Sequence, residues 1–295
     1  MHCKNTCKNR VSNGSLCYSE GPCTNLEGAK YGSCLTQRFK DKAGIITGGA
    51  AGLGLAAAKR LIQEGADLLL VDLNADALEA AKAEVQAEGD SRVETFVANV
   101  ANEDEVKAYV AKAVELFGKI DGFFNNAGIE GKQNLTESYG ADEFHRVVAI
   151  NLNGVFYGMA EVLRVMATKE TGGHIVNTAS VGGILGVGNQ SGYSASKHGV
   201  VGLTRNSARE YGTKNITINA IALGAIMTAM VEGSLKQMDP ENWEEAGQAF
   251  VSSNPTCRFG KPEEVAATVA FLLSDDAGFI NGSILPIDGG QHGMY

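Results

Sequence analysis

The chain has 295 residues, of which 44% are hydrophobic, and a formal net charge of −9 at pH 7. This length and apolar content suffice for one large domain, and the acidic balance disfavours nucleic acid or an anionic membrane as a partner. No apolar run approaches the roughly 20 residues that a membrane helix needs. We therefore expect a soluble, cytoplasmic protein that acts on a small molecule.

The first 38 residues differ in composition from the rest of the chain. They hold five of the six cysteines and are rich in Gly, Ser and Asn, without apolar periodicity. The cysteine spacing matches no paired C-x2-C pattern, and the segment lacks the apolar run of a secretory signal. We predict a disordered extension over residues 1–38 rather than a metal knuckle or disulfide staple, and we expect no metal site.

Strand-like and helical segments alternate from residue 39 to residue 295. Strand-like runs lie at 42–48, 67–73, 92–100, 120–128, 173–179, 215–222 and 283–287, and helical patterns at 49–65, 75–89, 103–118, 142–168, 192–212 and 262–273. Strands separated by helices of this length form parallel sheets. The alternation therefore predicts an α/β protein of the Rossmann type, with a doubly wound parallel sheet in a single domain.

The first strand-to-helix turn is rich in glycine. Gly48, Gly52 and Gly54 follow a strand and open a helix, where absent Cβ atoms and free amides suit a pyrophosphate. Asp72 ends the next strand, 18 residues after Gly54, near the position expected for binding the adenosine ribose. Glycine also serves in ordinary turns, and Asp72 could be a solvated strand end, but the combination predicts a dinucleotide site.

Asp72 also indicates which dinucleotide binds. A carboxylate at this position accepts hydrogen bonds from ribose hydroxyls and repels a 2′-phosphate. None of the neighbouring residues Ala50, Ala51, Leu73 and Asn74 is basic. The sequence therefore predicts NAD as the cofactor.

Tyr193 and Lys197 stand four residues apart in the predicted helix 192–212, a spacing that brings both to one face. A free tyrosine, with a pKa of about 10, is a poor base near neutral pH, and a nearby ammonium group lowers that pKa. Alone, the pair could be an ordinary surface contact. Beside a dinucleotide site, it predicts an acid/base group for hydride chemistry.

These motifs together resemble the short-chain dehydrogenase/reductase family over residues 39–295. The resemblance rests on Gly48-x3-Gly52-x-Gly54, Asn125-Asn126-Ala127-Gly128, Asn151, Ser180 and Tyr193-x3-Lys197, which occur in that family's order and spacing. It implies that Tyr193 is the general acid/base, that Lys197 holds the nicotinamide ribose and that Ser180 polarises the substrate oxygen. It also implies that Asn151 holds a water linking Lys197 to solvent, with a satisfied buried amide as the alternative.

The resemblance implies further cofactor contacts. They are Leu53, Asn99, Val100, Asn125, Ala127, Gly128, Gly224, Ile226 and Thr228. Asn99 stands where the family usually has an Asp against the adenine amino group, and its amide oxygen can still accept that bond. Asn125, Ala127 and Gly128 would line the adenosine, although a plain strand-ending turn is the alternative. Leu223 replaces the family's usual proline, so the following loop lacks a fixed φ.

Residues 226–256 occupy the position of the family's substrate lid. Met227, Met230 and Trp243 are adaptable apolar groups that suit a bulky, weakly polar ketone, although some could simply pack a helix on the sheet. We predict substrate contacts by Glu130, Ser180, Val181, Tyr193, Met227 and Met230. Glu130 would orient a second polar group of the substrate, and His174 is interpreted as structural.

The leading prediction is an NAD(H)-dependent oxidoreductase that interconverts a ketone and a secondary alcohol, with a cyclic or steroid-like substrate. A 3-oxoacyl-[acyl-carrier-protein] reductase is the alternative, disfavoured by Asp72 and by the acidic lid. A non-catalytic nucleotide-binding scaffold should lack Tyr193 or Lys197, and both are present. The resemblance also implies a homotetramer, joined by helices 103–118 and 142–168 and the C-terminal strands, with about four times the 30.9 kDa chain mass.

Overall fold

A computed structural model describes residues 37–252 and 254–294 of the chain. Within these residues, seven strands form one sheet in the order β3-β2-β1-β4-β5-β6-β7, and all neighbouring strands are parallel. They are β1 (Ala43–Thr47), β2 (Asp67–Asp72), β3 (Val93–Val97), β4 (Gly122–Asn125), β5 (Gly173–Thr178), β6 (Ile216–Leu223) and β7 (Ile284–Ile287). The predicted doubly wound parallel sheet is confirmed.

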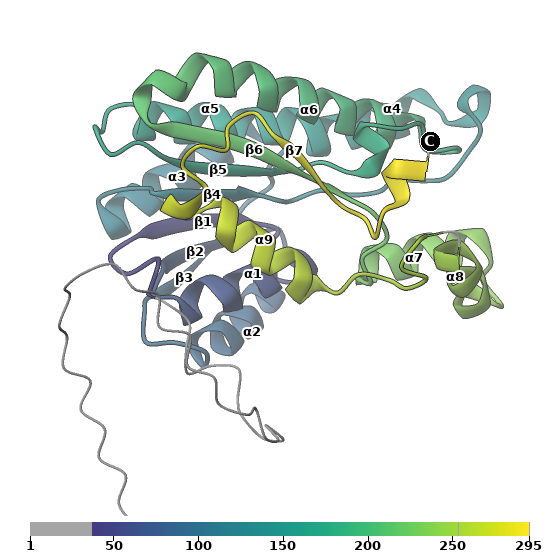
Figure 1. Cartoon of the computed structure of the whole chain (residues 1–295), viewed down its shortest axis with the longest axis horizontal. Helices are drawn as coiled ribbons and strands as arrows, with labels where there is room; N and C mark the ends of the chain where they lie inside the picture. Colours follow the sequence, from purple (N-terminus) through teal and green to yellow (C-terminus); the bar gives the residue numbers. More distant parts are fainter. Residues whose placement is uncertain (1–36, 253, 295) are drawn as a thin grey trace, which may run out of the picture. The chain divides into compact units, whose positions relative to one another are not determined.

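Helices cover both faces of the sheet (Figure 1). One face packs against α1 (Gly52–Gln63), α2 (Ala75–Gln86) and α9 (Pro262–Leu272), and the other against α3 (Glu103–Phe117), α5 (Gly154–Met166) and α6 (Ser191–Tyr211). Successive strand side chains point to opposite faces, so Ile45 and Ile46 enter different cores. None of the described helices combines the length and apolarity that crossing a membrane requires.

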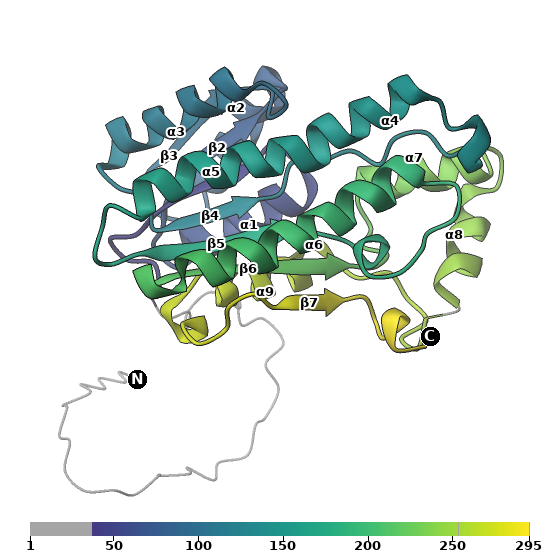
Figure 2. The same cartoon turned by 90° about the horizontal axis from the view of Figure 1, so that it is seen from above.

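The strand order reverses between β1 and β4, because the chain runs outward to β3 and then returns to pair β4 with β1. Doubly wound folds bind ligands in the crevice at the carboxyl ends of the strands at such a point. Two further helices, α7 (Ala229–Met238) and α8 (Trp243–Ser252), lie beyond this end of the sheet (Figure 2). They occupy most of the predicted lid.

The predicted helix 142–168 contains a π-helical turn. It consists of α4 (Ala141–Val148), the π turn Ala149–Asn153 and α5. Nδ2 of Asn125 donates to the Val155 carbonyl oxygen at 2.9 Å, and a Cβ on Gly154 would lie 3.0 Å from the Val100 carbonyl oxygen. These contacts fix the backbone just after the turn. Such turns are frequent at functional sites, and this one carries Asn151.

Residues 37 and 38 fall within the predicted extension 1–38 and are described by the structure, where Arg38 pairs with a residue of the domain. The Glu64 side chain is fully buried at the end of α1 and accepts hydrogen bonds from Arg38 at 2.5 and 2.8 Å and from Arg60 at 2.6 Å. A buried carboxylate needs cationic partners, and Arg38 is one of them. The remainder of the predicted extension, residues 1–36 with their cysteines, lies outside the described residues.

Arg38→Ala should lower the free energy of unfolding by about 2 kcal/mol at neutral pH, because Glu64 would keep only one cationic partner. Burial raises the pKa of Glu64, but hydrogen bonds from Arg38 and Arg60 outweigh burial and leave that pKa lowered. The stabilisation is therefore present above the unfolded-state pKa and is lost as the pH falls. Urea unfolding at several pH values measures both effects.

The matched control is Lys59→Ala, on α1, which removes an exposed ion pair with Glu84 of α2. Exposed pairs contribute about 0–1 kcal/mol, so this variant should unfold almost as the wild type does. Equal losses from Lys59→Ala and Arg38→Ala would contradict the assignment of Arg38 to the folded domain.

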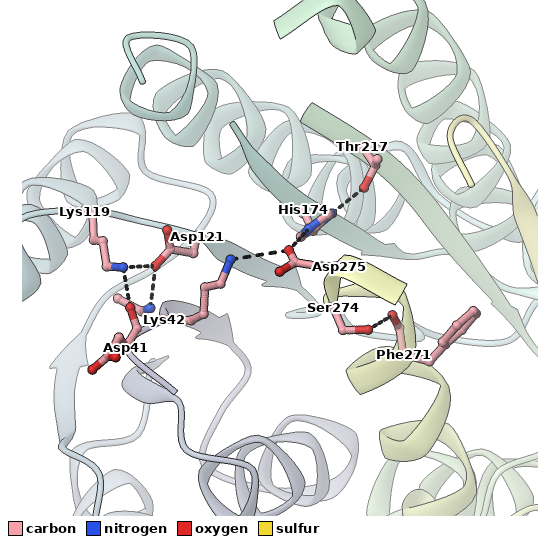
Figure 3. A network of polar contacts seen from close by, with 10 residues as sticks. Asp41, Lys42, Lys119, Asp121, His174, Thr217, Phe271, Ser274 and Asp275 are labelled. Carbon is pink, nitrogen blue, oxygen red and sulfur yellow. Dashed lines mark hydrogen bonds and ion pairs between the residues drawn. The ribbon is translucent and has the colours of Figure 1, made fainter. Parts of the chain in front are cut away.

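A polar network lies at the amino ends of β1 and β5, opposite the crevice (Figure 3). Asp275 Oδ1 lies 3.3 Å from Lys42 Nζ and 3.3 Å from His174 Nε2. The other ring nitrogen of His174 lies 2.8 Å from Thr217 Oγ1, and burial lowers the pKa of His174. These contacts agree with the structural role expected for His174.

Candidate active site

The turn between β1 and α1 leaves room for an anion. Gly48 and Gly52 have φ values of +65° and +51°, which side chains rarely adopt, and a Cβ on Gly54 would lie 2.0 Å from the Gly48 carbonyl oxygen. Helix α1 begins without a side-chain cap or an acidic residue in its first turn, whereas Asn74 and Asn102 cap α2 and α3. Its amino end therefore suits a phosphate group.

A cavity of about 260 Å³ opens over this turn. Of the predicted cofactor residues, it is lined by Gly48, Gly52, Leu53, Asp72, Ala127, Gly128, Tyr193, Lys197 and Thr228. Residues that were not predicted as cofactor contacts also line it, namely Ala51, Asn126, Ile129, Thr178, Ala179, Leu223, Ala229 and Met230, the last of which was predicted as a substrate contact. The glycine turn, the end of β2 and the start of α6 thus meet at one cavity, where the glycines leave the space that a dinucleotide requires.

The structure does not place Asn125 on this cavity, contrary to the expectation that it lines the adenosine. The side chain is buried, and Nδ2 donates to the Val155 carbonyl oxygen at 2.9 Å and to Asn177 Oδ1 at 3.2 Å. Asn125 therefore joins β4 to α5 and β5. The next residue, Asn126, lines the cavity instead, and only its place in the Asn-Asn-Ala-Gly motif could have indicated this.

Five other predicted cofactor residues also lie away from the cavity lining. One of them is Gly54, which packs against the backbone of Gly48. Asn99 is exposed, and its Oδ1 accepts a hydrogen bond from the Ala101 amide at 3.0 Å. Val100 packs closely against Gly154, where a Cβ would lie 3.0 Å from the Val100 side chain. Gly224 and Ile226 line two neighbouring cavities. Cofactor contacts by these residues stay predictions.

Asp72 is held beside the glycine turn by backbone amides. Its Oδ2 accepts from the Ala50 amide at 3.2 Å, and its Oδ1 accepts from the amides of Leu73 and Asn74 at 2.7 and 3.3 Å. The carboxylate also lines the cavity. It is therefore fixed in position and presents a negative charge to a bound ligand.

Tyr193 and Lys197 lie on one face of α6, as their spacing predicts. The Lys197 Nζ lies 5.6 Å from the centre of the Tyr193 ring and donates to the Thr178 carbonyl oxygen at 2.7 Å. The Lys197 side chain is almost fully buried, at 3% exposure. Its ammonium group is thus anchored to the end of β5, next to the phenol.

Ser180 follows β5 and faces Tyr193. Its Oγ accepts from the Gly182 amide at 3.1 Å and donates to the Leu223 carbonyl oxygen at 3.4 Å, and it also hydrogen-bonds the Tyr193 side chain. Leu223, which replaces the family's usual proline, is the last residue of β6 and lines the cavities on both sides of Tyr193. The Ser180 hydroxyl and the Tyr193 phenol therefore lie together in the wall of one cavity.

Burial lowers the pKa of Lys197 to about 8. Burial also raises the pKa of Tyr193, and the hydrogen bond with Ser180 only partly opposes this shift. The expected lowering of the Tyr193 pKa depends on Lys197 together with the positive charge of oxidised nicotinamide and stays a prediction. In the protein alone, desolvation of the phenolate is the larger effect and the pKa is raised. The protonated phenol is the form that can give a proton to a carbonyl oxygen.

Asn151 is fully buried and fixes the loop after β4. Its Nδ2 donates to the Ile129 carbonyl oxygen at 2.7 Å and to Ser196 Oγ at 3.3 Å, and its Oδ1 accepts from the Ile129 amide at 2.8 Å. A Cβ on Gly128 would lie 3.1 Å from Asn151 Oδ1 and 3.6 Å from Lys197 Nζ. Asn151 thus holds Gly128 beside Lys197, and its contact with a water stays a prediction.

A second cavity, of about 400 Å³, adjoins Tyr193 and Ser180 on the side of the lid. Glu130, Ser180, Val181, Tyr193 and Met230 line it, as predicted, together with Gln133, Val187, Gln190, Leu235, Met238, Phe250 and Gln291. Met227 and Trp243 are not among its lining residues. Met227 is 38% exposed, and Trp243 packs under the Lys236 ammonium at 5.1 Å, which joins α8 to α7.

Glu130 links the loop after β4 to the lid. Its Oε1 accepts hydrogen bonds from Ser234 Oγ on α7 at 2.6 Å and from Gln190 Nε2. Gln133 Nε2 donates to the same Ser234 Oγ at 2.7 Å. Burial raises the pKa of Glu130, although these hydrogen bonds oppose the shift. The carboxyl group is therefore held in place by its neighbours in the cavity.

The fold and the site together define a dinucleotide-dependent oxidoreductase. The family model described as enoyl-(acyl carrier protein) reductase matches residues 48–292. The levodione reductase of Leifsonia aquatica is 59% identical over 261 residues, which are 88% of this chain and 97% of that protein. The chain belongs to the short-chain dehydrogenase/reductase family, as the motifs predicted.

Three further comparisons support this assignment. The cyclohexanol dehydrogenase of Acinetobacter sp. (strain SE19) is 42% identical over 256 residues, which are 86% of this chain and 96% of that protein. The crystal structure of levodione reductase matches with a TM-score of 0.86 over 87% of this chain and all of that chain. The structure of NAD+-bound xylitol dehydrogenase, 36% identical, matches with a TM-score of 0.82 over 85% of this chain and 99% of that chain.

Proposed function

We propose that this enzyme interconverts a cyclic ketone and the corresponding secondary alcohol with NAD(H). The observation that carries this proposal is the position of Tyr193, which lines both the cavity over the glycine turn and the cavity under the lid. A proton-transferring group between a cofactor site and a substrate site is what the reaction requires. The relatives named for cyclohexanol and levodione support a cyclic substrate.

NAD fits the first cavity. The glycine turn would hold its pyrophosphate, Asp72 the adenosine ribose and Lys197 the nicotinamide ribose, and the NAD+-bound neighbour supports this choice. The cofactor supplies a hydride to the carbonyl carbon in the reductive direction and accepts one in the oxidative direction.

The residues of this chain would transfer the proton and hydrogen-bond the substrate oxygen. Ser180 would hydrogen-bond the carbonyl oxygen and stabilise the negative charge that develops there. Tyr193 would donate its phenolic proton to that oxygen during reduction and take it back during oxidation. Lys197, buried beside the ring, would stabilise the resulting phenolate. The short distance from Lys197 Nζ to the Thr178 carbonyl oxygen, 2.7 Å, keeps the ammonium group in place.

The lining of the second cavity supports an uncharged ring as substrate. Apolar side chains from three segments form much of its wall, among them Val181, Met230, Leu235 and Phe250. Among its described lining residues, Glu130 carries the only ionisable carboxyl group, which opposes an acidic substrate. Glu130 would lie opposite a polar group of the substrate that is distant from the reacting carbon.

We also propose a homotetramer in the cytoplasm. Apolar side chains are exposed on two elements expected at subunit interfaces: Phe156 on α5 is 50% exposed and Leu285 on β7 is 37% exposed. A symmetric assembly would cover such side chains.

A substrate panel tests the proposed function. Purified protein should reduce cyclohexanone-type ketones with NADH and oxidise the matching alcohols with NAD+, while acetoacetyl thioesters of an acyl carrier protein should be poor substrates. Absorbance at the NADH band measures each rate. Turnover of the carrier thioester together with inactivity on every cyclic ketone would replace this proposal by the acyl-carrier-protein reductase alternative.

A further inference from the structure

Helix α7 of the lid is packed lightly. Of its residues, all of which the structure describes, only Leu235 is buried. A Cβ on Gly247 of α8 would lie 2.9 Å from the Leu235 side chain, so this residue packs against the other lid helix. Segments with few buried apolar contacts open readily. The polar contacts of α7 with the rest of the domain therefore matter for how firmly it stays over the substrate cavity.

Within the described part of the chain, the side chains of α7 form hydrogen bonds outside the lid only with residues 130–133. Gln133 Nε2 donates to Ser234 Oγ at 2.7 Å, and Ser234 Oγ donates to Glu130 Oε1 at 2.6 Å. The backbone amide of Gln133 donates to Gln237 Oε1 at 3.3 Å. Gln133 thus contacts α7 at two positions that lie about one helical turn apart.

The segment that follows Gln133 is fixed to the start of α6. The Asn134 amide donates to the Asn189 carbonyl oxygen at 2.9 Å, and Thr136 Oγ1 lies 3.0 Å from Ser191 Oγ. Ser191 is the first residue of α6, two residues before Tyr193. The loop that contacts the lid is therefore anchored next to the helix turn that carries the phenol.

We propose that Gln133 is a positioning residue that holds α7 closed over the substrate cavity. It joins Ser234 and Gln237 of the lid to a loop that is anchored at the start of α6. A closed lid retains the bound ketone and excludes water, while the proton still comes from Tyr193. Gln133 therefore affects substrate retention rather than proton transfer. This inference rests on the proposed function, since it takes the ketone to bind in the cavity beside Tyr193.

Gln133→Met tests this role, because it keeps the length of the side chain and removes the donor to Ser234. Loss of that hydrogen bond should raise KM for cyclohexanone about fivefold, with kcat within about twofold of the wild type. Amide hydrogen exchange over residues 229–238 of the intact enzyme should become faster by a similar factor, because α7 loses a contact that opposes its local opening. Gln63→Met, on α1 and hydrogen-bonded to Glu88, is the control and should change none of these values.

A double-mutant cycle with Ser234→Ala separates lid closure from a direct contact with the substrate. If Gln133 acts through Ser234, the double variant should have nearly the KM of Ser234→Ala alone. A KM raised by the product of the two single effects would overturn the inference in favour of direct substrate contact by Gln133. Unchanged exchange in Gln133→Met would overturn it in favour of a lid held by other contacts. Failure of the wild type to reduce cyclohexanone would refute the proposed function, and the exchange rates would still decide the role of Gln133 in the lid.

Discussion

Replacing Tyr193 by Phe should lower kcat for ketone reduction by about 10³-fold, because it removes the proton donor while keeping the ring. The phenol is the acidic group that hydrogen-bonds Ser180 and lies beside Lys197. Binding of NADH should be almost unchanged, since the cofactor cavity keeps its glycine turn and Asp72. Steady-state kinetics and a fluorescence titration with NADH measure the two effects.

Tyr211→Phe is the matched control, because it removes a tyrosine hydroxyl from the far end of the same helix. It should retain wild-type turnover. Lys197→Ala should weaken both NADH binding and turnover, which separates its role from that of Tyr193. Substantial activity in Tyr193→Phe would mean that another group donates the proton.

The second large effect concerns the choice of cofactor. The wild type should prefer NADH over NADPH, and Asp72→Ala combined with Ala51→Arg should shift the ratio of kcat/KM toward NADPH by about 10²-fold or more. The change removes a carboxylate that would repel a 2′-phosphate and adds a guanidinium group that can bind it. Kinetics with both reduced cofactors at saturating ketone measure the ratio.

The contacts of Asp72 require a control for this experiment. Its two oxygens accept three backbone hydrogen bonds from the turn, so Asp72→Ala alone also loosens the turn. Asp72→Asn keeps an acceptor and loses the charge, so it should relax the discrimination against NADPH with little loss of NADH binding. A wild type that used NADPH as well as NADH would refute the role of Asp72.

The sequence was informative wherever local rules determine structure. Apolar periodicity located the strands and helices because each buries one face or both, and the glycine turn was recognisable because few other residues fit its backbone. Tyr193 and Lys197 could be placed together because helix geometry alone relates residues four apart. Their separation in the structure agrees with that prediction.

Features that depend on distant contacts could not be predicted in this way. The contacts just after the π turn, from Asn125 to the Val155 carbonyl oxygen and from Gly154 to Val100, join residues distant in the chain, and no local pattern reports either contact. For the same reason, the sequence placed Asn125 rather than Asn126 at the cavity. The pairing of Arg38 with Glu64 was missed because the two residues are distant in the chain. The place of Gln291 in the cavity wall was missed because that wall is formed by several elements.

The polar network of Lys42, His174 and Asp275 lies at the end of the sheet opposite the two cavities. This network therefore shares no residue with the lining of either cavity. Distant sites contribute almost additively to stability, so the lid can accumulate substitutions without loosening the amino edge. The separation of the two regions is compatible with relatives that are about 40% identical to this chain and are named for different alcohols, cyclohexanol and a hydroxysteroid.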